Sequence, residues 1–197
     1  MSKSKFMHCV LSAAVALAFS VPFASNAAPK AATMNTPAAP AVDKSDQKIV
    51  IGMAQANMAE VAAGKLALEK SQSVEVKAFA QQMIDDHGRA LADVTALAQD
   101  KGVTLPAAPD KKHQAMAAKL AKLNGAAFDK SYMAQAGVAD HKQVHAALKK
   151  DEARAKDPDV KALAAKMLPT VEQHLHAASG LATGKAGGKA EHAGMKH

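Results

Sequence analysis

Four polar side chains interrupt stretches whose spacing otherwise places apolar residues on one face of a helix. They are one glutamate and three histidines: Glu60, His87, His141 and His174. His87 shows the pattern most clearly, because it follows Val76 and Met83 and precedes Val94 at the spacing of a helical stripe. Imidazole and carboxylate groups bind transition metals, or they pair with each other through hydrogen bonds. The chemistry therefore depends on whether the fold brings the four side chains together.

Helices are the elements that must position these residues. The chain has 197 residues, of which 49% are apolar and only 3% aromatic. Much of the apolar share is alanine, a composition that favours close-packed helices over a sheet. Apolar periodicity predicts long helices over about 44–71, 74–101, 126–156 and 158–182, and a short helix over about 110–123. Short first and last connections then make an all-α fold, an antiparallel four-helix bundle with the extra short helix in its middle connection.

Local signals mark where the helices begin and end. Ser73 and Asp157 are suited to cap the helices that follow them, and Pro158 stands at a first helical position, where proline is tolerated. Gly102 ends the second helix. Pro169 falls inside the last helix, so a kink or a lost backbone hydrogen bond is expected there.

The four polar positions are expected at one level of the bundle. In an antiparallel hairpin, residues equally far from the turn lie side by side. Glu60 stands about twelve residues before the first turn and His87 about fifteen after it, so their heights differ by roughly 4–5 Å. His141 and His174 match in the same way, about fifteen residues before Asp157 and about seventeen after it. The sequence thus predicts a polar layer with one member from each long helix.

Two chemistries satisfy such a layer, because burying unpaired polar groups costs several kcal/mol. The first is a metal site, in which Glu60, His87, His141 and His174 hold one divalent ion such as zinc, copper or iron. Other side chains offer alternative or supporting ligands: Asp85, Asp86, Asp140, Tyr132, His145 and Glu172. The second is a closed hydrogen-bond network, in which Glu60 accepts from His87 or His141 and Tyr132 joins. His113 and His176 are expected on the surface.

Several segments around these residues resemble domain-of-unknown-function family 4142. They are Glu60-Val-Ala-Ala-Gly-Lys-Leu-Ala67, Val76-Lys-Ala-Phe-Ala80 with Met83-Ile-Asp-Asp-His87, Phe128-Asp-Lys-Ser-Tyr132 followed by His141, and Leu168-Pro-Thr-Val-Glu-Gln-His174-Leu175. The resemblance covers residues 46–182. It implies an exported bacterial protein with a ferritin-like helical bundle, of the kind labelled outer-membrane or periplasmic protein. It implies no activity.

A di-iron centre is not expected, although the ferritin-like class suggests iron. A carboxylate-bridged di-iron site takes a Glu from each of two helices and a Glu-x-x-His motif from each of the other two. This sequence contains no Glu-x-x-His, and Glu172 and His174 are two residues apart, the wrong spacing to share a helix face. A single metal ion remains open as the cofactor.

Both ends of the chain read as segments outside the bundle, which is expected over 44–182. Residues 1–27 have the pattern of a cleaved signal peptide, with Lys3 and Lys5 before an apolar run and small residues at Ser25 and Ala27. Export to the periplasm follows, and association with the outer membrane is left open. Residues 28–43 are expected to be a flexible leader and 183–197 a disordered tail. Cys9 lies in the signal peptide, so the mature chain has no thiol.

Other function classes find little support in the sequence. The net charge is +7, but basic and acidic residues are interspersed along the helices, so no nucleic-acid-binding stripe is expected. No Gly-x-Ser-x-Gly motif or nucleophile set indicates an enzyme, and no run is suited to span a membrane. We interpret the chain as a non-enzymatic binding or stress-associated accessory protein with a Glu/His layer. The alternative is a periplasmic metal-binding protein that uses this layer, or the tail 191–197 for weak copper or nickel binding. No partner is identified.

Overall fold

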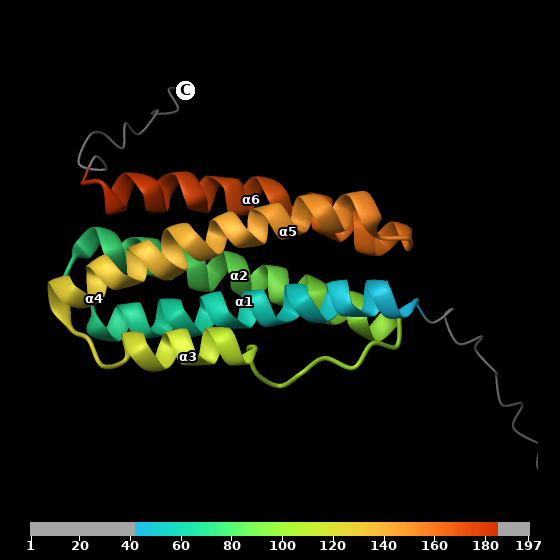
Figure 1. Cartoon of the computed structure of the whole chain (residues 1–197), viewed down its shortest axis with the longest axis horizontal. Helices are drawn as coiled ribbons and strands as arrows, with labels where there is room; N and C mark the ends of the chain where they lie inside the picture. Colours follow the sequence, from blue (N-terminus) through green and yellow to red (C-terminus); the bar gives the residue numbers. More distant parts are fainter. Residues whose placement is uncertain (1–41, 185–197) are drawn as a thin grey trace, which may run out of the picture. The chain divides into compact units, whose positions relative to one another are not determined.

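The computed structural model describes residues 42–184, and this part of the chain is helical with short connections (Figure 1). Its helices in chain order are α1 (Lys44–Lys70), α2 (Val74–Asp100), α3 (Lys111–Leu120), α4 (Gly125–Tyr132), the π-helix η1 (Met133–Asp140), α5 (His141–Arg154) and α6 (Pro158–Ala182). The expected signal peptide and most of the expected leader and tail lie outside the described residues. None of the helices in the described part is long and apolar enough to cross a membrane.

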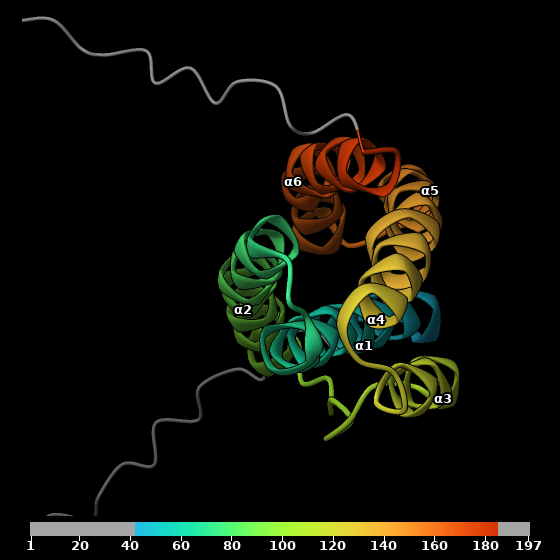
Figure 2. The same ribbon diagram turned by 90° about the vertical axis from the view of Figure 1, so that its left-hand side faces the viewer.

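The long helices pack side by side and enclose a common core. Viewed along their length, α1, α2, α5 and α6 surround that core, and α3 lies outside it against α1 and α4 (Figure 2). α1 packs most extensively on α2, and α5 on α6. The predicted all-α helical bundle is therefore confirmed. The short helix lies in the middle connection of this bundle.

The expected capping residues begin and end the helices. Asp157 accepts hydrogen bonds from the backbone N–H groups of Asp159 and Val160, and Ser73 accepts one from Val76. Gly102 follows α2 with a φ of 66°, a left-handed conformation that glycine adopts without strain. These contacts satisfy donors that a helix terminus leaves free.

Two apolar clusters lie on either side of the polar positions. One contains Val50, Val94, Leu148 and Val160, and the other contains Phe79, Met83, Phe128 and Tyr132. Along each long helix, the buried polar residue falls between the members of the two clusters, as His87 does between Met83 and Val94. The polar layer thus divides the core into two apolar halves.

Close packing of α1 against α2 depends on one glycine. A Cβ atom at Gly64 would lie 2.9 Å from the carbonyl oxygen of Ala80 and 2.9 Å from Cγ1 of Ile84. Real Cβ atoms do not approach backbone oxygen this closely, so only glycine fits without a shift. The close contact at Gly64 therefore holds together the hairpin that carries Glu60 and His87.

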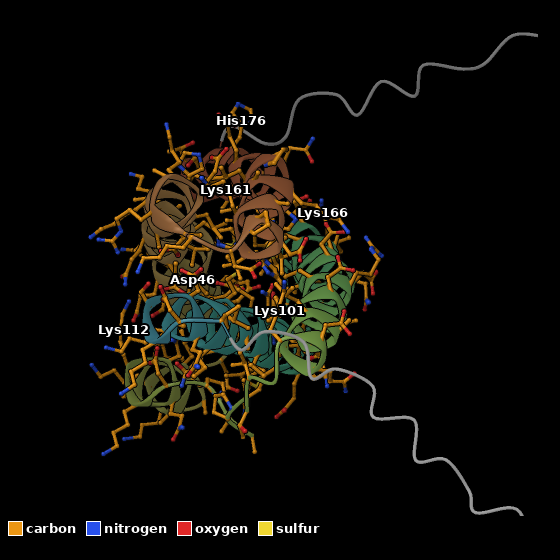
Figure 3. All side chains as sticks on the ribbon, turned by 90° about the vertical axis from the view of Figure 1, so that its right-hand side faces the viewer. Asp46, Lys101, Lys112, Lys161, Lys166 and His176 are labelled. Carbon is orange, nitrogen blue, oxygen red and sulfur yellow. The ribbon has the colours of Figure 1, made fainter. Side chains whose placement is uncertain are left out.

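Charged residues hold together the end of the bundle at which α1 begins and α2 ends (Figure 3). Asp46 is fully buried, and its Oδ2 accepts from the backbone N–H groups of Lys156 at 3.0 Å and Asp157 at 2.7 Å. Lys101 lies 2.8 Å from Asp157 and 2.6 Å from Asp159. These contacts fasten α1 and α2 to the connection between α5 and α6.

The third long helix differs from its expected regular form. The sequence predicts one α-helix over 126–156, but residues Met133–Asp140 form a π-helix between α4 and α5. A π-helix widens the turn by one residue and is often found at functional sites. Here it leads directly into His141.

Candidate metal centre

Three buried histidines meet at the centre of the bundle. His87 comes from α2, His141 from α5 and His174 from α6, and their exposed fractions are 4%, 1% and 0%. His87 Nε2 lies 3.4 Å from His141 Nε2 and 3.3 Å from His174 Nδ1. Within residues 42–184, these are the three His, Cys, Asp or Glu side chains whose ligand atoms all lie within 4.8 Å of one another. We call them the histidine triad.

The outer nitrogen of His87 is held by Asn57. His87 Nδ1 lies 2.8 Å from Asn57 Oδ1, in the buried core. The amide orientation of Asn57 is fixed, because its Nδ2 donates to the carbonyl oxygen of Met53 at 2.8 Å. Asn57 Oδ1 can only accept, so the proton of neutral His87 is on Nδ1.

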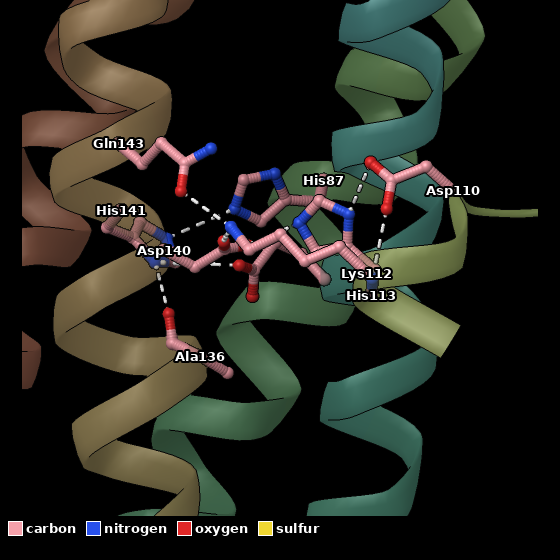
Figure 4. A network of polar contacts seen from close by, with 9 residues as sticks. His87, Asp110, Lys112, His113, Ala136, Asp140, His141 and Gln143 are labelled. Atoms are coloured by element: carbon pink, nitrogen blue, oxygen red, sulfur yellow. Dashed lines mark hydrogen bonds and ion pairs between the residues drawn. The ribbon is translucent and has the colours of Figure 1, made fainter. Parts of the chain in front are cut away.

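The other two rings are oriented by acceptors as well. His141 Nδ1 donates to the carbonyl oxygen of Ala136 at 2.9 Å (Figure 4). His174 Nε2 donates to Asp86 Oδ2 at 2.8 Å. Both outer nitrogens therefore carry the proton, and the inner nitrogens, His141 Nε2 and His174 Nδ1, present lone pairs toward His87.

The triad is uncharged at neutral pH. Burial, together with the neighbouring rings of His141 and His174, lowers the pKa of His87 to about 3. Burial also lowers the pKa of His141 to about 4, and it lowers the pKa of His174 below its usual value. Three lone pairs thus converge with no proton between them, an arrangement that a cation would stabilise.

The spacing of the inner nitrogens fits a metal ion. A tetrahedral ion with metal–nitrogen distances of about 2.0–2.1 Å separates its ligands by about 3.3–3.4 Å. The two contacts of His87 Nε2, at 3.3 and 3.4 Å, match this separation. An oxygen acceptor on the outer nitrogen of each ring is also the usual arrangement around metal-binding histidines.

The π-helix supplies the acceptor for His141. The backbone N–H of His141 bonds to the carbonyl of Val138, and its ring bonds to the carbonyl of Ala136. Asp140 and His141 are both buried at the end of this segment, with exposed fractions of 3% and 1%. The local backbone therefore sets the ring orientation that aims Nε2 inward.

Glu60 lies beside the triad, near the outer nitrogen of His141. Its Oε1 is 3.7 Å from His141 Nδ1, the nitrogen that donates to Ala136. Glu60 does not belong to the group whose ligand atoms lie within 4.8 Å of one another. Burial, and then the charge of Asp140, raise the pKa of Glu60 well above its usual value. Its role as a metal ligand, proposed from the sequence, stays a prediction.

The closed network expected from the sequence does not form. Glu60 was to accept from His87 or His141, with Tyr132 joining. Instead the two rings donate to Asn57 and Ala136, and neither the Glu60 oxygens nor Tyr132 Oη has a hydrogen-bond partner among the described residues. The stripe positions were sufficient to bring the side chains to one level but did not determine which atoms bond.

A second histidine contact fastens the short helix α3 to the site. Asp140 Oδ2 accepts from His113 Nε2 at 2.9 Å, and His113 Nδ1 donates to Asp110 at 2.9 Å (Figure 4). The hydrogen bond to Asp140, despite burial, raises the pKa of His113. The expectation of a surface His113 was wrong, since it is 8% exposed. Its burial depends on where α3 docks, which the helical pattern did not show.

The residues that orient the triad were only partly found from the sequence. Asp86 is among the alternative or supporting ligands that the sequence offers. Asn57 was missed, although it lies one helical turn before Glu60 on the same buried stripe of α1. The acceptor at Ala136 is a backbone carbonyl, so no side-chain type in the sequence indicates it.

Comparisons with known proteins identify a family and a fold. The family model described as "Domain of unknown function (DUF4142)" matches residues 31–181. No curated protein matches the chain. One similar solved structure is a DUF305 fragment from Deinococcus radiodurans, with a TM-score of 0.65 and 17% identity, covering 73% of this chain and 99% of that one. Another is described as CopM in the Cu(II)-bound form, with a TM-score of 0.59 and 19% identity, covering 71% and 96%. Both similarities support the helical-bundle fold.

Proposed function

This chain belongs to the DUF4142 family, whose description assigns no function, and we propose that it is a metal-binding protein that holds one transition-metal ion in the histidine triad. One observation carries the proposal. The inner nitrogens of His87, His141 and His174 converge as unprotonated lone pairs, while an oxygen acceptor holds each outer N–H. A metal cation converts this mutual repulsion into three coordinate bonds.

The donor set selects among ions. Three neutral imidazoles suit zinc, copper, nickel and ferrous iron, whereas calcium and magnesium prefer oxygen ligands. Among divalent ions of this series, copper binds nitrogen sites most tightly. The neighbour described as Cu(II)-bound shares only the fold with this chain, yet it is a further reason to test copper first. Zinc is the second ion to test.

The binding experiment uses the untagged chain from residue 28 onward. Calorimetric titration with copper and with zinc is expected to give one tight site per chain. Replacing all three histidines of the triad with glutamine removes that site. His176→Gln is the matched control, because His176 is exposed on the same helix as His174. Tight binding that survives the triple replacement, or that is absent from the wild type, contradicts the proposal.

We also propose that the protein is exported and acts as an accessory protein in the periplasm. The support is the charge and apolar pattern of residues 1–27, with small residues before Ala28. Copper and zinc ions that enter an exported protein would meet the triad without competition from thiols, because Cys9 is removed with the signal peptide. Sequencing the mature protein from a periplasmic fraction is expected to show Ala28 first. A protein that is found in the cytoplasm and still begins at residue 1 would contradict export.

A further inference from the structure

A small internal cavity lies next to the histidine triad. Its volume is about 10 Å³, close to the least that holds one water molecule. It is lined by residues from four helices: Ala56, Asn57, Glu60, His87, His141, Val144 and Met167. Two of the three triad rings therefore border the same water-sized space.

The carboxyl group of Glu60 lines this cavity without a hydrogen-bond partner among the described residues. The residue is only 2% exposed, and neither of its carboxyl oxygens has a hydrogen-bond partner among residues 42–184. A buried polar group without a partner destabilises the folded state, so native structures place a polar molecule against it. A water-sized cavity bounded by a carboxyl group and two imidazole rings meets that requirement.

The number of protein ligands points the same way. Structural zinc sites use four protein ligands, whereas sites that bind an exchangeable molecule use three. In the described part of the chain, no fourth His, Cys, Asp or Glu side chain joins the triad. An ion held there has a coordination position left for a molecule from solvent.

We propose that the ion bound by the triad keeps one exchangeable coordination position, which opens into this cavity and takes a water molecule hydrogen-bonded to Glu60. The inference rests on the proposed metal-binding function and adds the ligand class, a water molecule or an anion of similar size. It makes the centre an open site instead of a closed structural one.

A surface groove adjoins the cavity between α2 and α6. The groove has a volume of about 460 Å³ and shares Asn57, His87 and Met167 with the cavity lining. Asp86 and Lys166 line the same groove. A water-sized ligand has only to pass these shared side chains to exchange with solvent.

The test uses the copper-loaded protein in heavy water. Pulsed electron paramagnetic resonance detects deuterons of a molecule bound directly to Cu(II). The wild type is expected to show coordinated, exchangeable deuterons. Glu60→Gln keeps them, because the amide still hydrogen-bonds to water. Glu60→Leu loses most of this signal while retaining one copper per chain, since its apolar side chain leaves the water without a partner.

Each outcome bears on a different claim. If no copper binds at the triad, the proposed function itself fails. If copper binds but the wild type shows no coordinated deuterons, the site is closed and the present inference is overturned while metal binding stands. An unchanged deuteron signal in Glu60→Leu places the water away from the cavity and also overturns it. Should Glu60→Leu fail to fold, the comparison of the wild type in light and heavy water still decides whether the site is open.

Discussion

His174 Nε2 donates to Asp86 Oδ2 over 2.8 Å, and this contact turns the opposite ring nitrogen toward His87. The carboxylate that accepts the proton lies on α2, one residue before His87, whereas the ring comes from α6. Asp86 thereby orients a ligand that lies on another helix. Asn57 and Ala136 do the same for the other two rings.

Removing the Asp86 acceptor is expected to weaken metal binding. In Asp86→Ala, His174 is free to rotate or to change which nitrogen carries the proton, and loss of such a partner typically lowers metal affinity about 10–100-fold. Titration calorimetry with zinc measures the change. Asp85→Ala is the control, since Asp85 is exposed and bonds only to Gln81 on its own helix. Equal affinities in the two variants would contradict a role for Asp86 in orienting the ring.

Replacing Asn57 is expected to destabilise the metal-free protein. Asn57→Ala leaves the buried N–H of His87 without an acceptor, which costs about 1–3 kcal/mol of unfolding free energy. Urea unfolding of the metal-free chain gives the value. Asn124→Ala serves for comparison, because the Asn124 side chain makes no capping bond at α4. A loss at Asn57 no larger than that at Asn124 would show that the contact is not holding His87.

The contact between His113 and Asp140 predicts how stability changes with pH. The hydrogen bond to Asp140 raises the pKa of folded His113 above its unfolded value of about 6.5. The stabilisation is therefore complete below about pH 6.5 and is lost as pH rises through the higher folded pKa. The unfolding free energy of the wild type should therefore fall as pH rises across this range. The fall should be steeper than that of His113→Gln, by up to about 1 kcal/mol per pH unit. Parallel curves for the two proteins would contradict the assignment.

Gly64 tests the packing that brings the first two helices together. Gly64→Ala forces a Cβ atom against the Ala80 carbonyl and is expected to cost about 1–3 kcal/mol. Gly52→Ala, on the same helix with nothing within 4 Å of its new Cβ, is expected to stabilise by about 0.5–1 kcal/mol. Thermal unfolding of the two variants separates close packing from helix propensity. The same sign of change in both would contradict the close approach of α1 and α2.

Helical periodicity was enough to predict the bundle and the level of the polar layer. Positions such as His87 and His174 fall on apolar stripes, and counting from the turns places them at one height. The direction of each ring could not be predicted in this way. It depends on an amide from α1, a carboxylate from α2 and a backbone carbonyl in a π-helix, and the last leaves no trace in side-chain pattern.

Glu60 shows the limit of counting heights. Its position on the stripe is right for the layer, yet its carboxyl group lies by the outer nitrogen of His141, 3.7 Å away. Counting residues from the turn gives the height of a side chain but does not show where its polar atoms lie. The burial of His113 was missed for a related reason, because it follows from where α3 docks beside Asp140.

X-ray absorption spectroscopy of the zinc-loaded wild-type protein tests the central claim most directly. One zinc per chain is expected, bound by three imidazole nitrogens at about 2.0–2.1 Å and one oxygen ligand. The triple replacement of His87, His141 and His174 should abolish this signal. A wild-type spectrum with fewer than three imidazoles around zinc, or one that persists in the triple variant, would contradict metal binding by the histidine triad.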